Sequence, residues 1–130
     1  MDWKEEVESD LASALRRLDA LAPEISGSMS GGQLREVWRC YLSVEKCVAF
    51  VKLELDEEGG ARFVNRKAYT VPDDRQAVSF AAGSLRAGLA DVRAGNLSAG
   101  LKSLRDSRNY LRMLLRRRIL SSRRPSSNAS

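Results

Sequence analysis

Residues 96–124 read NLSAGLKSLRDSRNYLRMLLRRRILSSRR and show the clearest helical pattern in the chain. Gly95 is expected to end the preceding helix, and Asn96 to cap this one. A junction of two residues forces its two helices to run antiparallel, so the stretch predicts a helical hairpin. At about 100° per residue, its core-facing arc consists of Leu97, Leu101, Leu104, Leu111, Leu114 and Leu115.

Three more segments carry helical signals. Each has apolar residues at spacings of three and four, and each begins with capping, acidic or proline residues typical of a helix N-terminus. We therefore predict an all-α, four-helix antiparallel bundle-like domain over residues 1–120, with a mobile basic, Ser-rich tail over residues 121–130. The expected helices cover residues 2–22, 31–57, 72–94 and 96–120.

The second expected helix carries two apolar stripes. Two adjacent stripes predict a helix that is buried over a wide arc, with Trp38 in the core. The β-branched residues and the Gly59–Gly60 pair also fit a β-hairpin around residues 47–71, so an α+β fold is the alternative. The first stripe is Leu34, Val37, Tyr41, Val44, Val48, Val51 and Leu55, and the second is Trp38, Leu42, Ala49 and Leu53.

The composition excludes several classes of site. The chain has no His, and its two cysteines, Cys40 and Cys47, lie about 10 Å apart on one helix face. They can neither bridge each other nor form a metal site, so we expect two reduced thiols in the core. Without a phosphate-binding loop or a nucleophile–base pair, the sequence predicts a protein that is not an enzyme and holds no cofactor or metal.

The hydropathy pattern predicts a cytoplasmic protein. The first ten residues, MDWKEEVESD, are acidic and lack the apolar region of a signal peptide. No stretch of about 18 consecutive apolar residues occurs, so we expect no membrane span.

Positive charge is concentrated near the C-terminus. Residues 96–124 sum to +8, whereas the whole chain is +5, so residues 1–95 sum to −3. Of the 22 cations, 17 are Arg, whose guanidinium forks onto phosphates and stacks on flat rings. On the last expected helix, a cationic ridge beside the leucine arc consists of Lys102, Arg105, Arg108, Arg112 and Arg116.

A second cationic segment is ARFVNRKAY, residues 61–69, in which aromatic residues alternate with cations. Unpaired bases stack on aromatic rings while cations contact the phosphate backbone. We therefore predict non-enzymatic binding of single-stranded DNA or RNA, with weak sequence preference, by this segment and the cationic ridge. The candidate residues in the segment are Arg62, Phe63, Arg66, Lys67 and Tyr69.

Two other interpretations account for the ridge. Its arginines can pair with acids of the first helix, namely Glu5, Glu6, Glu8 and Asp10, and form a solvated face. Alternatively, an apolar edge joins a second copy or an acidic partner, which makes the protein an oligomeric interaction or scaffold subunit. A homo-oligomer is compatible with nucleic-acid binding, because several weak ridges then meet one strand. The expected edge is Leu111, Leu114, Leu115 and Ile119.

The layout of the expected helices is similar to that of HEPN-type helical domains, with a long buried second helix and a closing Arg- and Leu-rich helix. This similarity is architectural and involves no specific motif. The RNase motif of that family needs an Arg followed by a His a few residues later, and this chain has no His. The resemblance therefore implies a binding or antitoxin-like role without RNase activity.

Overall fold

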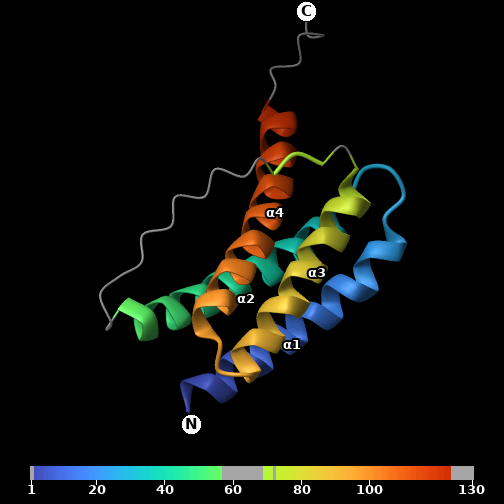
Figure 1. The fold of residues 1–130 in the computed structure, drawn as a ribbon. Helices are drawn as coiled ribbons and strands as arrows, with labels where there is room; N and C mark the ends of the chain where they lie inside the picture. Colours follow the sequence, from blue (N-terminus) through green and yellow to red (C-terminus); the bar gives the residue numbers. More distant parts are fainter. Residues whose placement is uncertain (1, 57–68, 72, 124–130) are drawn as a thin grey trace, which may run out of the picture.

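The computed structural model describes residues 2–56, 69–71 and 73–123. Within these ranges the chain is helical and contains no strand, which confirms the predicted all-α bundle (Figure 1). The elements are α1 (Trp3–Leu21), the short 3-10 helix η1 (Ala22–Glu24), α2 (Gly31–Asp56), α3 (Asp74–Arg93) and α4 (Leu97–Arg123).

Helix α2 settles the choice between the two predicted folds. It continues through residues 47–56, so this stretch does not form the first strand of a hairpin around residues 47–71. The rest of that alternative, residues 57–68, lies outside the described residues, as does the predicted tail from residue 124 onward. Helix α4 runs to Arg123, three residues beyond its predicted end.

Local side chains fix the starts of three helices. The Asp2 carboxylate accepts from the backbone N of Lys4 at 3.5 Å, and the Asp73 carboxylate accepts from that of Arg75 at 2.8 Å. At α2 the backbone N of Gln33 donates to Ser30 Oγ at 3.2 Å, and the Gln33 side chain accepts from the Ser30 backbone N at 2.9 Å. This reciprocal pair is a capping box, one of the helix N-terminal signals on which the predicted helices depend.

The four helices pack in a ring. Helix α1 packs on α2 and α3, α4 also packs on α2 and α3, and the two remaining pairs lie diagonally apart within the described residues. Figure 1 shows α3 between α1 and α4, with α2 crossing behind them. Acids on α1 therefore do not lie beside cations on α4.

The most extensive contact between two described helices joins α3 and α4, the two arms of the predicted hairpin. Gly95, with a φ of +83°, makes the turn between them. A Cβ atom at Gly88 would stand 2.6 Å from Leu104 Cδ2, and one at Gly100 would stand 3.1 Å from Val92 Cγ2. Because Leu104 is fully buried, this approach depends on the absence of a side chain at Gly88.

Only one face of α2 is covered. Val37, Val44 and Val51 are fully buried, whereas Trp38, Leu42 and Leu53 are 48%, 47% and 64% exposed. The prediction that the second apolar stripe and Trp38 belong to the core is therefore wrong. The reason is the ring arrangement: α2 contacts α1 and α4 but not α3, so no described helix covers its outer side.

The two cysteines face the core, as the sequence predicts. Cys40 and Cys47 are free thiols at 1% and 0% exposure. Burial raises the pKa of the Cys40 thiol to about 11 and that of Cys47 to about 12, although nearby Arg17 and Lys46 act in the opposite direction. Thiolate, the reactive form, is therefore strongly disfavoured in the folded protein.

We expect Gly88→Ala to destabilise the fold. Overpacking against Leu104 costs about 1–3 kcal/mol and outweighs the roughly 1 kcal/mol that alanine gains in a helix, so the free energy of unfolding should fall by about 1 kcal/mol. Gly83→Ala is the matched control, because a Cβ there meets nothing within 4 Å and should stabilise by about 1 kcal/mol. Urea denaturation measures both. Equal stability of the two variants would contradict the close approach.

We also expect neither thiol to react with a disulfide reagent at pH 8 while the protein is folded. Labelling should become complete on the addition of denaturant, because unfolding exposes both sulfurs and returns their pKa values to the ordinary range near 8.5. Mass spectrometry after timed labelling gives the measurement. Rapid labelling of the native protein would show that these thiols are accessible.

Candidate nucleic-acid interface between α2 and α4

A shallow hollow lies where α2 meets the C-terminal half of α4. It has a volume of about 240 Å³ and is lined by Leu34, Arg35 and Trp38 of α2 and by Leu115 and Arg118 of α4. The Trp38 ring is stacked on Tyr41 of the next turn, with a centroid distance of 5.7 Å and an interplanar angle of 24°. The hollow thus presents a supported indole between two arginines. We use the name α2–α4 seam for this hollow together with Glu45 of α2 and Arg108, Arg112 and Arg116 of α4.

Glu45 of α2 organises the next part of the seam. Its Oε2 accepts from the Tyr41 hydroxyl at 2.6 Å, and its two oxygens lie 3.3 Å from Arg108 Nη1 and 3.6 Å from Arg112 Nη2. Burial on its own would raise the pKa of Glu45. The Tyr41 hydrogen bond and the two guanidinium groups outweigh it, so this pKa lies below its ordinary value.

The cationic ridge is partly internal. Only 18% of the Arg108 side chain is exposed, and its guanidinium donates hydrogen bonds to Glu45 and Asn109. Arg108 therefore mainly connects α4 to α2. Arg112 is 43% exposed, and its Nη2 lies 3.6 Å from Glu45 Oε2. Lys102 and Arg116 are exposed and make no ion pair among the described residues, while Arg105 is half-buried.

The acids of α1 do not neutralise the ridge. Lys46 of α2 pairs with Asp10 at 2.6 Å and with Glu6 at 3.4 Å, and Arg93 of α3 pairs with Glu8 at 3.7 Å. The expected pairing between α1 acids and α4 arginines is therefore wrong for the described residues. The physical reason is that α1 and α4 lie diagonally opposite in the ring.

The second predicted cationic segment is mostly beyond what the structure describes. Arg62, Phe63, Arg66 and Lys67 fall in residues 57–68, outside the described ranges. Tyr69 is described, and it is half-buried. Its hydroxyl donates to Asp106, and its ring meets Tyr110 edge to face at 4.9 Å and 85°. Tyr69 thus packs the segment that precedes α3 onto α4, and its ring is already in contact with Tyr110.

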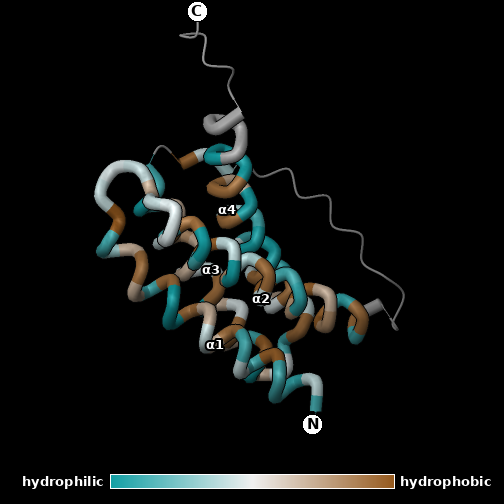
Figure 2. The backbone as a smooth tube through the Cα atoms, turned by 180° about the vertical axis from the view of Figure 1, so that it is seen from behind, coloured by the Kyte–Doolittle hydropathy of each residue, from teal (hydrophilic) through white to brown (hydrophobic). Residues whose placement is uncertain are grey.

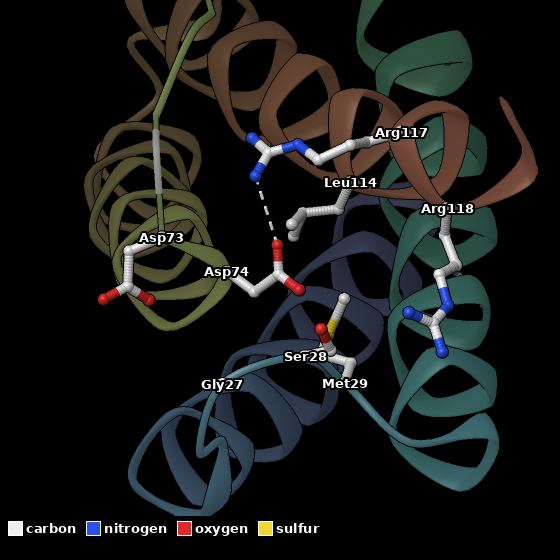
Figure 3. Close-up of a pocket in the computed structure, with 8 residues that line it drawn as sticks. All are labelled: Gly27, Ser28, Met29, Asp73, Asp74, Leu114, Arg117 and Arg118. Atoms are coloured by element: carbon white, nitrogen blue, oxygen red, sulfur yellow. Dashed lines mark hydrogen bonds and ion pairs between the residues drawn. The ribbon is translucent and has the colours of Figure 1, made fainter. Parts of the chain in front are cut away.

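A larger cavity of about 490 Å³ adjoins the seam at the end of α4 (Figure 3). Arg117 crosses it to Asp74 at 3.2 Å and also donates to the Val71 carbonyl, which ties α4 to the start of α3. Arg118 points the other way, beside α2, and lines both the cavity and the hollow. The other lining residues are Gly27, Ser28, Met29, Asp73 and Leu114.

The apolar edge predicted on the last helix is not exposed at Leu111 and Leu114. Leu111 and Leu114 are 0% and 1% exposed, and Leu115 is half-buried against the core. The side chain of Ile119 lies outside the described set. Among the described residues, the large exposed apolar side chains are Trp38, Leu42 and Leu53 of α2 and Phe80 of α3.

Sequence reasoning missed Arg35, Trp38 and Arg118 as members of the site. Trp38 continues an apolar stripe, which predicts a core position, and Arg118 does not lie on the cationic ridge. A usable signal was the spacing of Arg35, Trp38 and Arg39, which alternates cations with an aromatic residue at the polar edge of the helix. This pattern resembles the one that singled out residues 61–69.

The described helices contain none long and apolar enough to cross a membrane, and no group of acids and cysteines placed to hold a metal ion. Comparison of the chain with protein-family models, with curated proteins and with solved structures gave no match.

The Glu45 contacts give a pH-dependent prediction. Because the folded pKa of Glu45 is lowered, its stabilisation is present above the ordinary value near 4.3 and is lost as pH falls through the lowered pKa. Glu45→Gln should therefore reduce the free energy of unfolding by about 1 kcal/mol at pH 7 and by much less near pH 3. Urea denaturation at both pH values measures the difference.

Glu54→Gln is the matched control, since it removes the same charge from the same helix at a carboxylate without an ion pair among the described residues. It should change stability little at either pH. A Glu45→Gln effect of the same size at pH 3 and pH 7 would show that charge plays no part in these contacts.

Proposed function

We propose that this protein binds single-stranded nucleic acid, without catalysing a reaction, along the α2–α4 seam. The main support for this proposal is the exposure of Trp38. Its indole is 48% exposed, stacks on Tyr41 and lies in the hollow that Arg35 and Arg118 also line. A base stacked on an aromatic side chain contributes roughly 1–3 kcal/mol, whatever its identity. A rigid exposed ring between guanidinium groups is suited to such stacking.

The charges around Trp38 support a phosphate backbone as the ligand. Among the described residues, Arg35, Arg116 and Arg118 make no ion pair, and Arg112 is held only by Glu45 at 3.6 Å. The single acid of the seam, Glu45, faces two arginines and is therefore neutralised. The surface beside the indole has a net positive charge, which attracts phosphates and releases their counterions on binding.

The seam favours single strands over a duplex. A stacking site needs a base that is already unpaired, because pulling one from a duplex costs a few kcal/mol. The hollow beside Trp38 has a volume of about 240 Å³, and a recess of this kind suits stacking on one exposed ring better than reading the edges of paired bases in a groove. Weak sequence preference follows, since every base has a face that can stack.

The experiment is an anisotropy titration with a labelled single-stranded oligonucleotide over a series of salt concentrations. Affinity should fall linearly on a log–log plot, with a slope of about −0.7 per neutralised phosphate. Arg116→Gln should reduce the steepness by about 0.7. Trp38→Ala should weaken binding by roughly 5- to 150-fold and leave the slope unchanged, because it removes stacking without charge.

Arg86→Gln is the matched charge control. Arg86 is on α3, 58% exposed and paired with Asp19, so its removal changes net charge by the same amount away from the seam. It should alter affinity less than twofold. The absence of binding by the unmodified protein at low salt would refute the proposal, and equal losses for Arg86 and Arg116 would refute the assignment to the seam.

A further inference from the structure

The cavity of about 490 Å³ at the end of α4 lies directly beside the hollow at Trp38, because Arg118 lines both. Its walls come from three segments that are far apart in the sequence, namely the loop before α2, the start of α3 and the C-terminal half of α4. Figure 1 and Figure 2 show these segments from opposite sides, at the same end of the bundle. The volume falls in the range of about 300–1,000 Å³ that is typical of ligand sites. A strand seated at Trp38 therefore has a second, larger recess beside it.

The charged side chains of the cavity are only partly committed to each other. Asp74 Oδ1 lies 3.2 Å from Arg117 Nη1, whereas the second oxygen of Asp74 points into the cavity (Figure 3) and has no partner among the described residues. The Arg118 guanidinium also makes no ion pair or hydrogen bond within the described ranges. Buried Met29 and Leu114 add apolar surface to the wall. The cavity therefore offers both a carboxylate oxygen and a guanidinium to a ligand.

These two groups select different parts of a nucleotide. A guanidinium binds phosphate, as the α4 cations of the seam are proposed to do. A carboxylate only accepts hydrogen bonds and repels phosphate, and Asp73, which caps α3, adds a second negative charge to the same wall. The part of a strand that lies against Asp74 must therefore carry a hydrogen-bond donor and no charge.

The sugar supplies such a donor only in RNA. Within a DNA strand, the 3′ and 5′ oxygens of each deoxyribose are esterified, so the sugar has no hydroxyl left to donate. Each ribose of an RNA strand keeps its 2′-hydroxyl, which both donates and accepts. An acidic wall beside a stacking site therefore distinguishes the two kinds of strand.

We propose that the strand bound at the seam is RNA, with one ribose seated in this cavity. Its 2′-hydroxyl donates to the free oxygen of Asp74, the adjoining phosphate meets Arg118, and a neighbouring base stacks on Trp38. The inference rests on the proposed function and names the kind of strand that the seam takes.

Desolvation of Asp74 strengthens the discrimination. Its side chain is only 20% exposed, so a sugar in the cavity displaces much of the water that remains on the free oxygen. A ribose replaces the lost hydrogen bond to water, whereas a deoxyribose leaves the oxygen unpaired, which costs affinity. DNA is therefore disfavoured as well as RNA being favoured.

The edge of a base is the other donor that a strand carries. A carboxylate that accepts from a base edge reads the identity of that base, because the bases differ in their donors. The stacking site at Trp38 accepts any base, and the 2′-hydroxyl is present at every position of an RNA strand. The ribose contact thus agrees with the weak sequence preference of the seam.

The test compares three labelled strands of one sequence that contains only A and C, each titrated against the full chain at low salt. One strand is RNA, one is DNA, and one carries fluorine in place of each 2′-hydroxyl, which keeps the sugar shape of RNA but removes the donor. We expect RNA to bind about tenfold more tightly than DNA, since a hydrogen bond to a charged group contributes roughly that factor or more. The fluorinated strand should bind within twofold of DNA.

Asp74→Ala should bring the ratio of RNA affinity to DNA affinity close to one. Arg117→Gln is the matched control, because it breaks the same ion pair but leaves the carboxylate in place. It should weaken binding of both strands by a similar factor and keep their ratio within twofold of the unmodified protein. The ratio is the informative quantity, since a general loss of stability or of positive charge affects both strands alike. Circular dichroism verifies that each variant folds.

The outcomes separate this inference from the proposed function. Equal affinity for RNA and DNA, or tight binding of the fluorinated strand, would overturn the assignment to RNA and leave single-strand binding at the seam intact. A preference for RNA that survives Asp74→Ala, or that disappears when the sequence contains only U, would overturn the ribose contact in the cavity. Failure of all three strands to bind would refute the proposed function itself, and this inference with it.

Discussion

The close approach of α3 and α4 at Gly88 determines how the rest of the chain packs. With no side chain at that position, Leu104 fills the space between the two helices, and the hairpin forms one compact unit. Helices α1 and α2 then pack against this unit and each other, so α2 has neighbours only at α1 and α4. The outward exposure of Trp38 and Leu53 follows from that arrangement.

Glu45 links this packing to the proposed binding surface. Its carboxylate accepts a hydrogen bond from Tyr41 of α2 and lies against Arg108 and Arg112 of α4. Tyr41 in turn stacks on the ring of Trp38. One carboxylate thus holds Arg108 and Tyr41 in place, and through Tyr41 it supports the ring of Trp38. The cations further along, Arg116 and Arg118, have no such acid beside them among the described residues, which leaves positive charge available to a ligand.

Much of the fold was predictable because its signals are local. The Ser30 and Gln33 capping box, the turn at Gly95 and the leucine arc of α4 each depend on residues close in sequence. The site was less predictable, because it depends on which helices become neighbours. Periodicity shows that Trp38 lies on an apolar stripe, but only the ring arrangement shows that this stripe is uncovered. In the same arrangement, the acids of α1 pair with cations of α2 and α3, whereas Arg108 and Arg112 of α4 pair with Glu45 of α2.

The most direct test of the account is amide chemical-shift mapping by NMR during titration with a short single-stranded oligonucleotide. The largest shifts should lie in residues 34–42 of α2 and 112–118 of α4, together with the Trp38 indole NH. The amides of α1 and those near Arg86 should change little. Shifts concentrated on α1 or α3, or no shifts at low salt, would contradict a binding surface at the α2–α4 seam.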